Sequence, residues 1–282
     1  MKKLIVFGDS FAEFKPGICE NQWVILLAKK LNIDFKNIRN FALGGTNIEF
    51  SIHALFKYIN SASYSQEDII LFVTTSDSRL SLLHESINPE WAGCYNAFLS
   101  GKLSENHPAF AMYEKDRDFY EKLFFYNNVK FKMSYRALVA LALKSLPNQA
   151  IIISAFKNVD NGLSSERKFL LDSTENFLYI NADLYQTSIN EHMGIDHYEL
   201  YDFFCHDPRE NHMCYSNHII LSDQIYECFI NKSNKFYNVN KFKSNIININ
   251  NVNEPLWNQE FRKSWKSLKN RENLVLKYKG NK

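Results

Sequence analysis

A serine directly follows the first apolar segment of the chain, in the stretch Phe7-Gly8-Asp9-Ser10. Two later apolar segments also end in small polar residues or glycine, at Gly44-Gly45-Thr46 and at Thr74-Thr75-Ser76-Asp77. These residue types suit acyl transfer, in which a hydroxyl attacks a carbonyl and N–H or O–H donors lie about 3 Å from the oxygen that becomes negative. For Ser10 the alternative is a turn serine or a helix cap, because Gly-Asp-Ser also occurs in turns.

Acyl transfer also needs a base, and three of the eight histidines lie in one segment, residues 205–218. A histidine of this segment could take the proton of Ser10, with a nearby carboxylate holding its tautomer. The same segment holds metal-ligand types, namely Cys205, His206, Asp207, His212, Cys214 and His218. Their spacings match no common zinc pattern, so we expect no metal and no cofactor, and a zinc site that uses three or four of them is the alternative.

The elements that must position these residues alternate between strands and helices. Mostly apolar runs predict strands at residues 4–7, 69–74, 150–155 and 177–181, and 38–42 resembles a further short strand. Helical periodicity predicts helices near 23–31, 52–59, 135–146 and 221–229. This alternation favours βαβ units and a mainly parallel sheet that is covered on both faces. In such a sheet the three polar strand ends share one edge, which brings the candidate groups together.

The quoted motifs resemble those of the SGNH hydrolase (GDSL-type esterase) superfamily over residues 1 to about 230. Phe7-Gly8-Asp9-Ser10 is similar to its first block, Asn40-Phe41-Ala42-Leu43-Gly44-Gly45-Thr46 to its second, and residues 212–221 to its last. The resemblance implies a three-layer α/β/α flavodoxin-like sandwich that needs no metal. It also implies that Ser10 is the nucleophile, that His212 is the base, and that the N–H groups of Ser10 and Gly45 serve the oxyanion hole.

Two positions depart from the pattern of that superfamily. Ser76 stands where an asparagine usually donates to the oxyanion, and a hydroxyl is the shorter donor. Arg209 stands three residues before His212, where the family has the acidic residue of the triad. We therefore assign the acid to Asp207, with Pro208 bending the loop, and a Ser10–His212 dyad is the alternative.

The resemblance implies serine-dependent hydrolysis of an ester, of the esterase or carbohydrate O-deacetylase type, on a small-molecule or glycan substrate. Transfer to an acceptor other than water stays open. Asp9, Asn47 and Arg79 are candidates for substrate contact; Arg79 would meet an anionic group, and a surface ion pair is its alternative. A competing hypothesis is a catalytically inactive module that binds a glycan or a protein through the aromatic-rich insertion at about residues 80–130.

Composition and charge limit the remaining possibilities. The net charge of +2 gives no general nucleic-acid signal. The five scattered cysteines and the lack of an export or membrane-spanning segment predict free thiols in the cytoplasm. Residues 231–282 follow the main domain as an asparagine-rich linker or edge hairpin and a basic amphipathic helix near 257–270. We expect this helix to pack on the domain, with docking to a protein or a membrane as the alternatives.

Overall fold

The fold is a parallel sheet enclosed by helices, as a computed structural model of the chain shows. The structure describes residues 2–14, 21–44, 46–75, 129–156, 172–191 and 212–246, with the side chains of 129–135 excepted. Its five strands are β1 (Leu4–Phe7), β2 (Ile38–Asn40), β3 (Ile69–Thr74), β4 (Gln149–Ser154) and β5 (Phe177–Ile180). All neighbouring pairs are parallel, in the order β2-β1-β3-β4-β5. This is the flavodoxin-like order, so the fold class predicted from the sequence is confirmed.

The central strands β1 and β3 are apolar up to Thr74, the last residue of β3, because both faces of the sheet are buried. Every residue of β1 and β3 is buried, and successive side chains point to opposite faces. Leu4 and Val6 thus belong to one core cluster, while Ile5 and Phe7 belong to the other. A polar residue in the middle of either strand would bury a side chain without a hydrogen-bond partner in one of these clusters.

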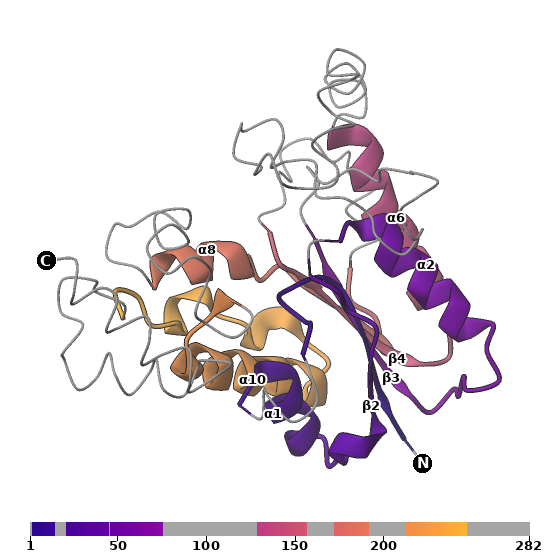
Figure 1. Cartoon of the computed structure of the whole chain (residues 1–282), viewed down its shortest axis with the longest axis horizontal. Coiled ribbons are helices and arrows are strands. Elements are labelled where there is room, and N and C mark those ends of the chain that lie inside the picture. The colour runs from indigo at the N-terminus through magenta and orange to yellow at the C-terminus, as the bar shows by residue number, and fades with distance from the viewer. Residues whose placement is uncertain are drawn as a thin grey trace, which may run out of the picture.

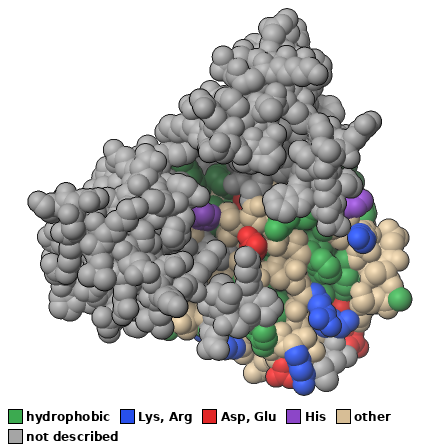
Figure 2. Space-filling model, viewed as in Figure 1, with side chains coloured by type: hydrophobic (Ala, Val, Ile, Leu, Met, Phe, Trp, Pro, Cys, Tyr) green, Lys and Arg blue, Asp and Glu red, His purple; other side chains and the backbone are tan. Residues whose placement is uncertain are grey.

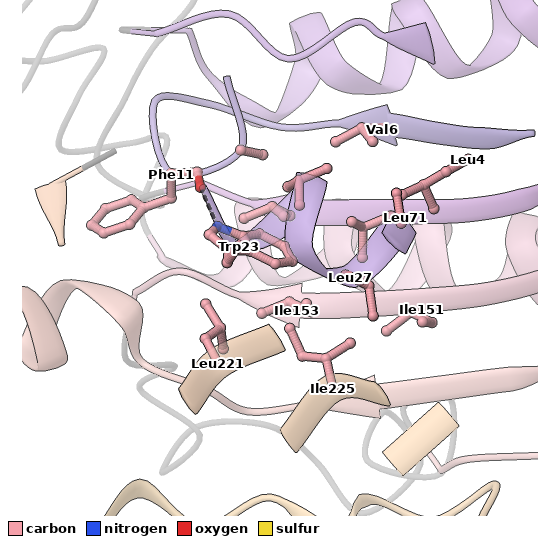
Figure 3. Packing of buried hydrophobic residues seen from close by; sticks show 14 of the residues in the cluster. Leu4, Val6, Phe11, Trp23, Leu27, Leu71, Ile151, Ile153, Leu221 and Ile225 are labelled. Carbon is pink, nitrogen blue, oxygen red and sulfur yellow. Dashed lines mark hydrogen bonds between the residues drawn. The ribbon is translucent and has the colours of Figure 1, made fainter. Parts of the chain in front are cut away.

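Two pairs of helices cover the two faces of the sheet (Figure 1). On one face lie α1 (Trp23–Lys30) and α10 (Tyr215–Ile230), and on the other lie α2 (Ile48–Ile59) and α6 (Val129–Lys144). Figure 3 shows Trp23 and Leu27 of α1, with Leu221 and Ile225 of α10, packed over the strands. In the same view Trp23 Nε1 donates to the carbonyl oxygen of Phe11 at 2.8 Å, which attaches α1 to the loop after β1.

Several elements differ in length from their sequence predictions. Helix α10 begins at Tyr215 rather than near 221, so His218, which precedes the predicted helix, is buried inside its first turns. Its N-cap residue, Cys214, makes no side-chain cap bond. Instead, the Cys214 N–H donates to the Glu191 carboxylate, which lies 23 residues earlier and which no local sequence pattern could reveal. Helix α6 begins earlier than residue 135, and helix α8 (Leu184–Asn190) has no counterpart among the predictions.

Residues 231–246, called here the 231–246 segment, pack against the main domain. Within this described part the segment forms two 3-10 turns, Asn234–Phe236 and Val239–Lys241, and no strand of an edge hairpin. Tyr237 packs on the core and donates its hydroxyl to the carbonyl oxygen of Ala182 at 2.9 Å. Through Tyr237 the 231–246 segment therefore contacts the core of the main domain. No helix of the described residues combines the length and apolar character needed to cross a membrane.

Candidate active site

The candidate site lies where β1 and β3 end, at the point where the strand order reverses direction. Strands β2 and β3 lie on opposite sides of β1, which makes this the topological switch point of the sheet. In open α/β sheets, ligands bind in the crevice at the carboxyl ends of the strands at such a point. Gly8 immediately follows β1 and Thr75 immediately follows β3, so both bordering loops begin here.

Gly8 lets β1 and β3 approach closely at this edge. Its φ of +147° is a backbone conformation that residues with a side chain rarely adopt. A Cβ added at Gly8 would lie 2.8 Å from the Val73 Cβ and 2.8 Å from the Val73 carbonyl oxygen. A larger residue would therefore force the two strand ends apart. The tight turn at Gly8 directs the chain into the loop that carries Asp9 and Ser10.

Asp9 organises the backbone around the candidate nucleophile. Its carboxylate is fully buried; Oδ1 accepts the Phe11 N–H at 3.1 Å and Oδ2 accepts the Thr75 hydroxyl at 2.8 Å. Its carbonyl oxygen accepts the N–H groups of Ala12 and Glu13, each at 2.9 Å. The N–H groups of residues 11, 12 and 13 are thus occupied. Within the described residues no acceptor is found for the N–H of Ser10, which leaves this donor available beside its own hydroxyl.

Ser10 and His212 meet although 202 residues separate them. His212 Nε2 lies 2.8 Å from Ser10 Oγ, within hydrogen-bond distance, and both side chains are partly buried. The Phe11 ring lies against the imidazole, with 5.2 Å between ring centroids. His212 adopts a left-handed backbone with φ of 61°, immediately before the buried Met213 and Cys214. An imidazole with Nε2 facing a hydroxyl can accept its proton, which is the geometry that a serine nucleophile requires.

The second block approaches Ser10 from the end of β2. The Phe41 N–H donates to the carbonyl oxygen of Val6, and the Leu43 N–H donates to that of Gly8. The chain therefore stays hydrogen-bonded to the β1 segment beyond the end of β2. A Cβ added at Gly44 would lie 3.5 Å from Ser10 Cβ and 2.7 Å from Glu13 Oε2. The Glu13 carboxylate already accepts the Gly44 N–H at 2.9 Å, so that donor is occupied. Glu13 could not be found from the sequence, because its partner Gly44 is 31 residues away and lies in another loop.

Two of the three candidates for substrate contact have protein partners. Asp9 is held as described above. Asn47 is the N-cap of α2; its side chain accepts the Phe50 N–H at 3.0 Å and donates to Glu49 at 2.7 Å, and 1% of its surface is exposed. Buried side chains with such bonds have a sufficient structural reason to be polar. Arg136 of α6 also reaches this edge, where it donates to the carbonyl oxygen of Thr75 at 3.4 Å.

The other predicted site residues lie outside the described residues. They are Gly45, Ser76, Arg79 and Asp207, together with the insertion at about 80–130 and the basic helix near 257–270. Of the five cysteines, Cys214 and Cys228 are described, and both are buried free thiols. His218, which sequence analysis grouped with metal-ligand types, accepts the Trp23 N–H at 3.4 Å through Nδ1.

Charged side chains of both signs lie on the face of the molecule drawn in Figure 2. A histidine and an acidic side chain lie near each other there, while lysine and arginine side chains gather lower on the same face. An acidic side chain lies close to the candidate nucleophile, since Glu13 contacts Gly44 beside Ser10. This arrangement favours a neutral or cationic group over an anionic one on the Glu13 side of Ser10.

Comparison with known proteins adds one distant likeness. No protein-family model matches the chain, and no curated protein matches it. Among solved structures, the chain is similar to one described as a member of the lipolytic protein G-D-S-L family from Veillonella parvula DSM 2008. The identity is 13%, the match covers 80% of this chain and 99% of that one, and the TM-score is 0.42. That description names the same group of proteins as the sequence resemblance, but so loose an overlap carries no weight for activity.

Proposed function

We propose that this chain is a serine-dependent hydrolase of ester bonds, of the SGNH type, acting on a small-molecule or glycan ester. The observation that carries the proposal is the 2.8 Å approach of His212 Nε2 to Ser10 Oγ at the switch point of the sheet. The N–H of Ser10, which has no acceptor among the described residues, supports it independently, because an oxyanion hole needs a donor that is already oriented and unoccupied.

In the proposed reaction, Ser10 Oγ attacks the ester carbonyl carbon as His212 Nε2 takes the hydroxyl proton. His212 must then carry its own proton on Nδ1 before the attack, so that the Nε2 lone pair faces Ser10. The tetrahedral intermediate collapses when the C–O bond of the leaving alcohol breaks and the imidazolium returns the proton to that oxygen. Water then attacks the acyl-enzyme with His212 as base, which releases the acid and restores Ser10.

The negative oxygen of the intermediate is proposed to bind the Ser10 N–H, with the Gly45 N–H and the Ser76 hydroxyl as further donors. Gly44 is an unsuitable donor because its N–H already binds Glu13. Asp207 is proposed to hold the Nδ1 proton of His212, and without it the pair would act as a dyad. Each lost donor of this type typically costs about 10²–10³ in kcat.

The test is covalent labelling of the full chain by a fluorophosphonate probe, with intact mass and peptide mapping. We expect one adduct, on Ser10, that disappears in Ser10→Ala. We also expect it to be lost in His212→Gln, because removal of either partner of such a pair costs about 10⁴-fold or more in rate. Ser63→Ala and His53→Gln are matched controls, since both residues are exposed and remote in sequence from the pair.

Two results would contradict the proposal. Folded wild-type protein without an adduct would favour the inactive binding module. An adduct that persists in Ser10→Ala would place the reactive group elsewhere. Hydrolysis of p-nitrophenyl acetate, measured on the same variants, distinguishes turnover from labelling alone.

A further inference from the structure

Glu191 is a buried carboxylate whose hydrogen bonds end beside the candidate base. It is the C-cap residue of α8 and is fully buried. Both of its carboxylate oxygens lie 2.9 Å from the backbone nitrogen of Cys214, which is two residues after His212. Its Oε1 also accepts from Asn217 Nδ2 at 2.7 Å. A buried carboxylate is costly unless hydrogen bonds satisfy it, so loss of these bonds is penalised and the Cys214 and Asn217 donors hold Glu191 in place.

Glu191 supplies the cap that helix α10 lacks in its own sequence. The first N–H groups of a helix have no intrahelical acceptor, and the N-cap Cys214 makes no side-chain bond to them. A carboxylate at this end is also favoured by the helix dipole. His212 lies two residues before Cys214 and has a left-handed backbone conformation. A shift of the Cys214 N–H would therefore move the backbone of His212 and, with it, the imidazole.

Asn217 connects the same carboxylate to the 231–246 segment. The Asn217 Nδ2 donates both to Glu191 and to the carbonyl oxygen of Lys243, the latter at 2.9 Å. The Asn217 Oδ1 accepts the Lys243 N–H at 2.8 Å. Asn245 N–H donates to the carbonyl oxygen of Asn190 at 2.8 Å, next to Glu191 in the chain. The two bonds to Lys243 fix the orientation of the Asn217 amide, because a flipped amide would place donor against donor and acceptor against acceptor.

We propose that Glu191 and Asn217 are positioning residues that hold His212 against Ser10, and that the 231–246 segment completes this support through Lys243. The inference rests on the proposed function, because it concerns the reactivity of that same pair. Glu191 does not touch the reacting atoms; it acts through the Cys214 N–H and the backbone that leads to His212. An error of 1 Å in such a catalytic group can cost about 10²-fold in rate.

The experiment measures the rate of fluorophosphonate labelling at Ser10 per folded molecule, together with kcat and KM for p-nitrophenyl acetate. Glu191→Ala should label at least about 10²-fold more slowly, with the loss in kcat rather than in KM. Glu191→Gln should lose less, because an amide oxygen at the Oε1 position still accepts from Cys214 and Asn217. Glu191→Met, which fills similar space but offers no carboxylate or amide acceptor to Cys214 and Asn217, should label as slowly as Glu191→Ala; labelling of Glu191→Met as fast as Glu191→Gln would mean that Glu191 only fills space.

Reversal of the donor and the acceptor gives a second test that does not depend on alanine variants folding. Asn217→Asp alone faces the Glu191 carboxylate with a second carboxylate, and we expect it to slow labelling. The double variant Glu191→Gln with Asn217→Asp restores a donor opposite an acceptor, so it should label faster than Asn217→Asp alone. The segment contact is kept in part, since the carboxylate introduced at position 217 can still accept the Lys243 N–H.

Asp68 provides the matched control at the opposite end of the sheet. It is also fully buried, and it accepts the Lys3 N–H at 2.9 Å and the Tyr58 hydroxyl at 2.6 Å. Asp68→Asn should lower the denaturation midpoint while folded molecules label at the wild-type rate. Folded Glu191→Ala or Asn217→Asp that labels as fast as wild type would overturn the inference while the proposed function stands. Wild-type protein that does not label overturns the proposed function, and this inference with it.

Discussion

Replacing Asp9 by alanine should destabilise the fold by an amount that the buried contacts of Asp9 allow us to work out. The change removes the acceptor of two donors, the Phe11 N–H and the Thr75 hydroxyl, on residues that are 2% and 1% exposed. A buried donor left without an acceptor costs about 1–3 kcal/mol. The Thr75 hydroxyl can turn to the carbonyl oxygen of Thr46, at 3.3 Å, so its share is at the low end. The expected loss is therefore about 2–4 kcal/mol, a large part of a typical stability of roughly 5–15 kcal/mol.

Asp9→Asn should cost only about 1 kcal/mol, the scale of a single exchanged hydrogen bond. Its amide oxygen can still accept the Phe11 N–H, and its NH₂ can donate to Thr75, whose own proton then goes to Thr46. Urea denaturation followed by tryptophan fluorescence would measure both variants, because Trp23 is buried in the core. In a double-mutant cycle with Thr75→Val, we expect a coupling of about 1–2 kcal/mol.

Two outcomes would refute this reasoning about Asp9. If Asp9→Asn destabilises as much as Asp9→Ala, the carboxylate charge matters more than its acceptor geometry. If Asp9→Asn keeps full stability and the labelling rate of Ser10 but raises KM strongly, Asp9 contacts the substrate, as the sequence analysis expected.

Two further predictions concern backbone strain and pH. Gly8→Ala should destabilise by about 3 kcal/mol or more, because strain at its positive φ and overpacking against Val73 each cost about 1–3 kcal/mol; a urea midpoint equal to that of wild type would contradict the close approach of β1 and β3. Stability should also fall as the pH rises above about 9. Burial raises the pKa of the Cys228 thiol to about 11, and burial together with the Asp68 carboxylate raises the pKa of Tyr58 above its usual range. The folded state holds both protons more tightly than the unfolded state. The stability from Cys228 is complete below about pH 8.5, the unfolded thiol pKa, and is lost towards pH 11, while the stability from Tyr58 begins to be lost only above about pH 10, the unfolded phenol pKa. Urea midpoints at pH 8 and pH 10.5 should show the loss, and Cys228→Ser should flatten it; a midpoint that rises with pH would have the wrong sign.

The strands were the most predictable elements of the fold. Residues 4–7 and 69–73 are apolar without interruption because helices cover both faces of the sheet, and the predicted bounds 4–7 and 69–74 match β1 and β3. The start of α10 was not predictable in this way. Ser216, Asn217 and His218 show no apolar periodicity, and the carboxylate that caps this end comes from Glu191, 23 residues earlier than Cys214.

The sequence by itself determined the strands, the parallel sheet class and the residue types at its carboxyl edge, since these depend on apolar runs and short motifs within a few residues. The tertiary structure brought His212, which the motif resemblance had named, against Ser10, and it alone decided how Asp9 binds the loop around that serine and that Glu191 and Asn217 contact the segment after His212. These contacts join segments from 2 to 202 residues apart. Their partners are chosen by strand order and by the burial of polar groups that must find a hydrogen bond, and neither leaves a periodic signal in the chain.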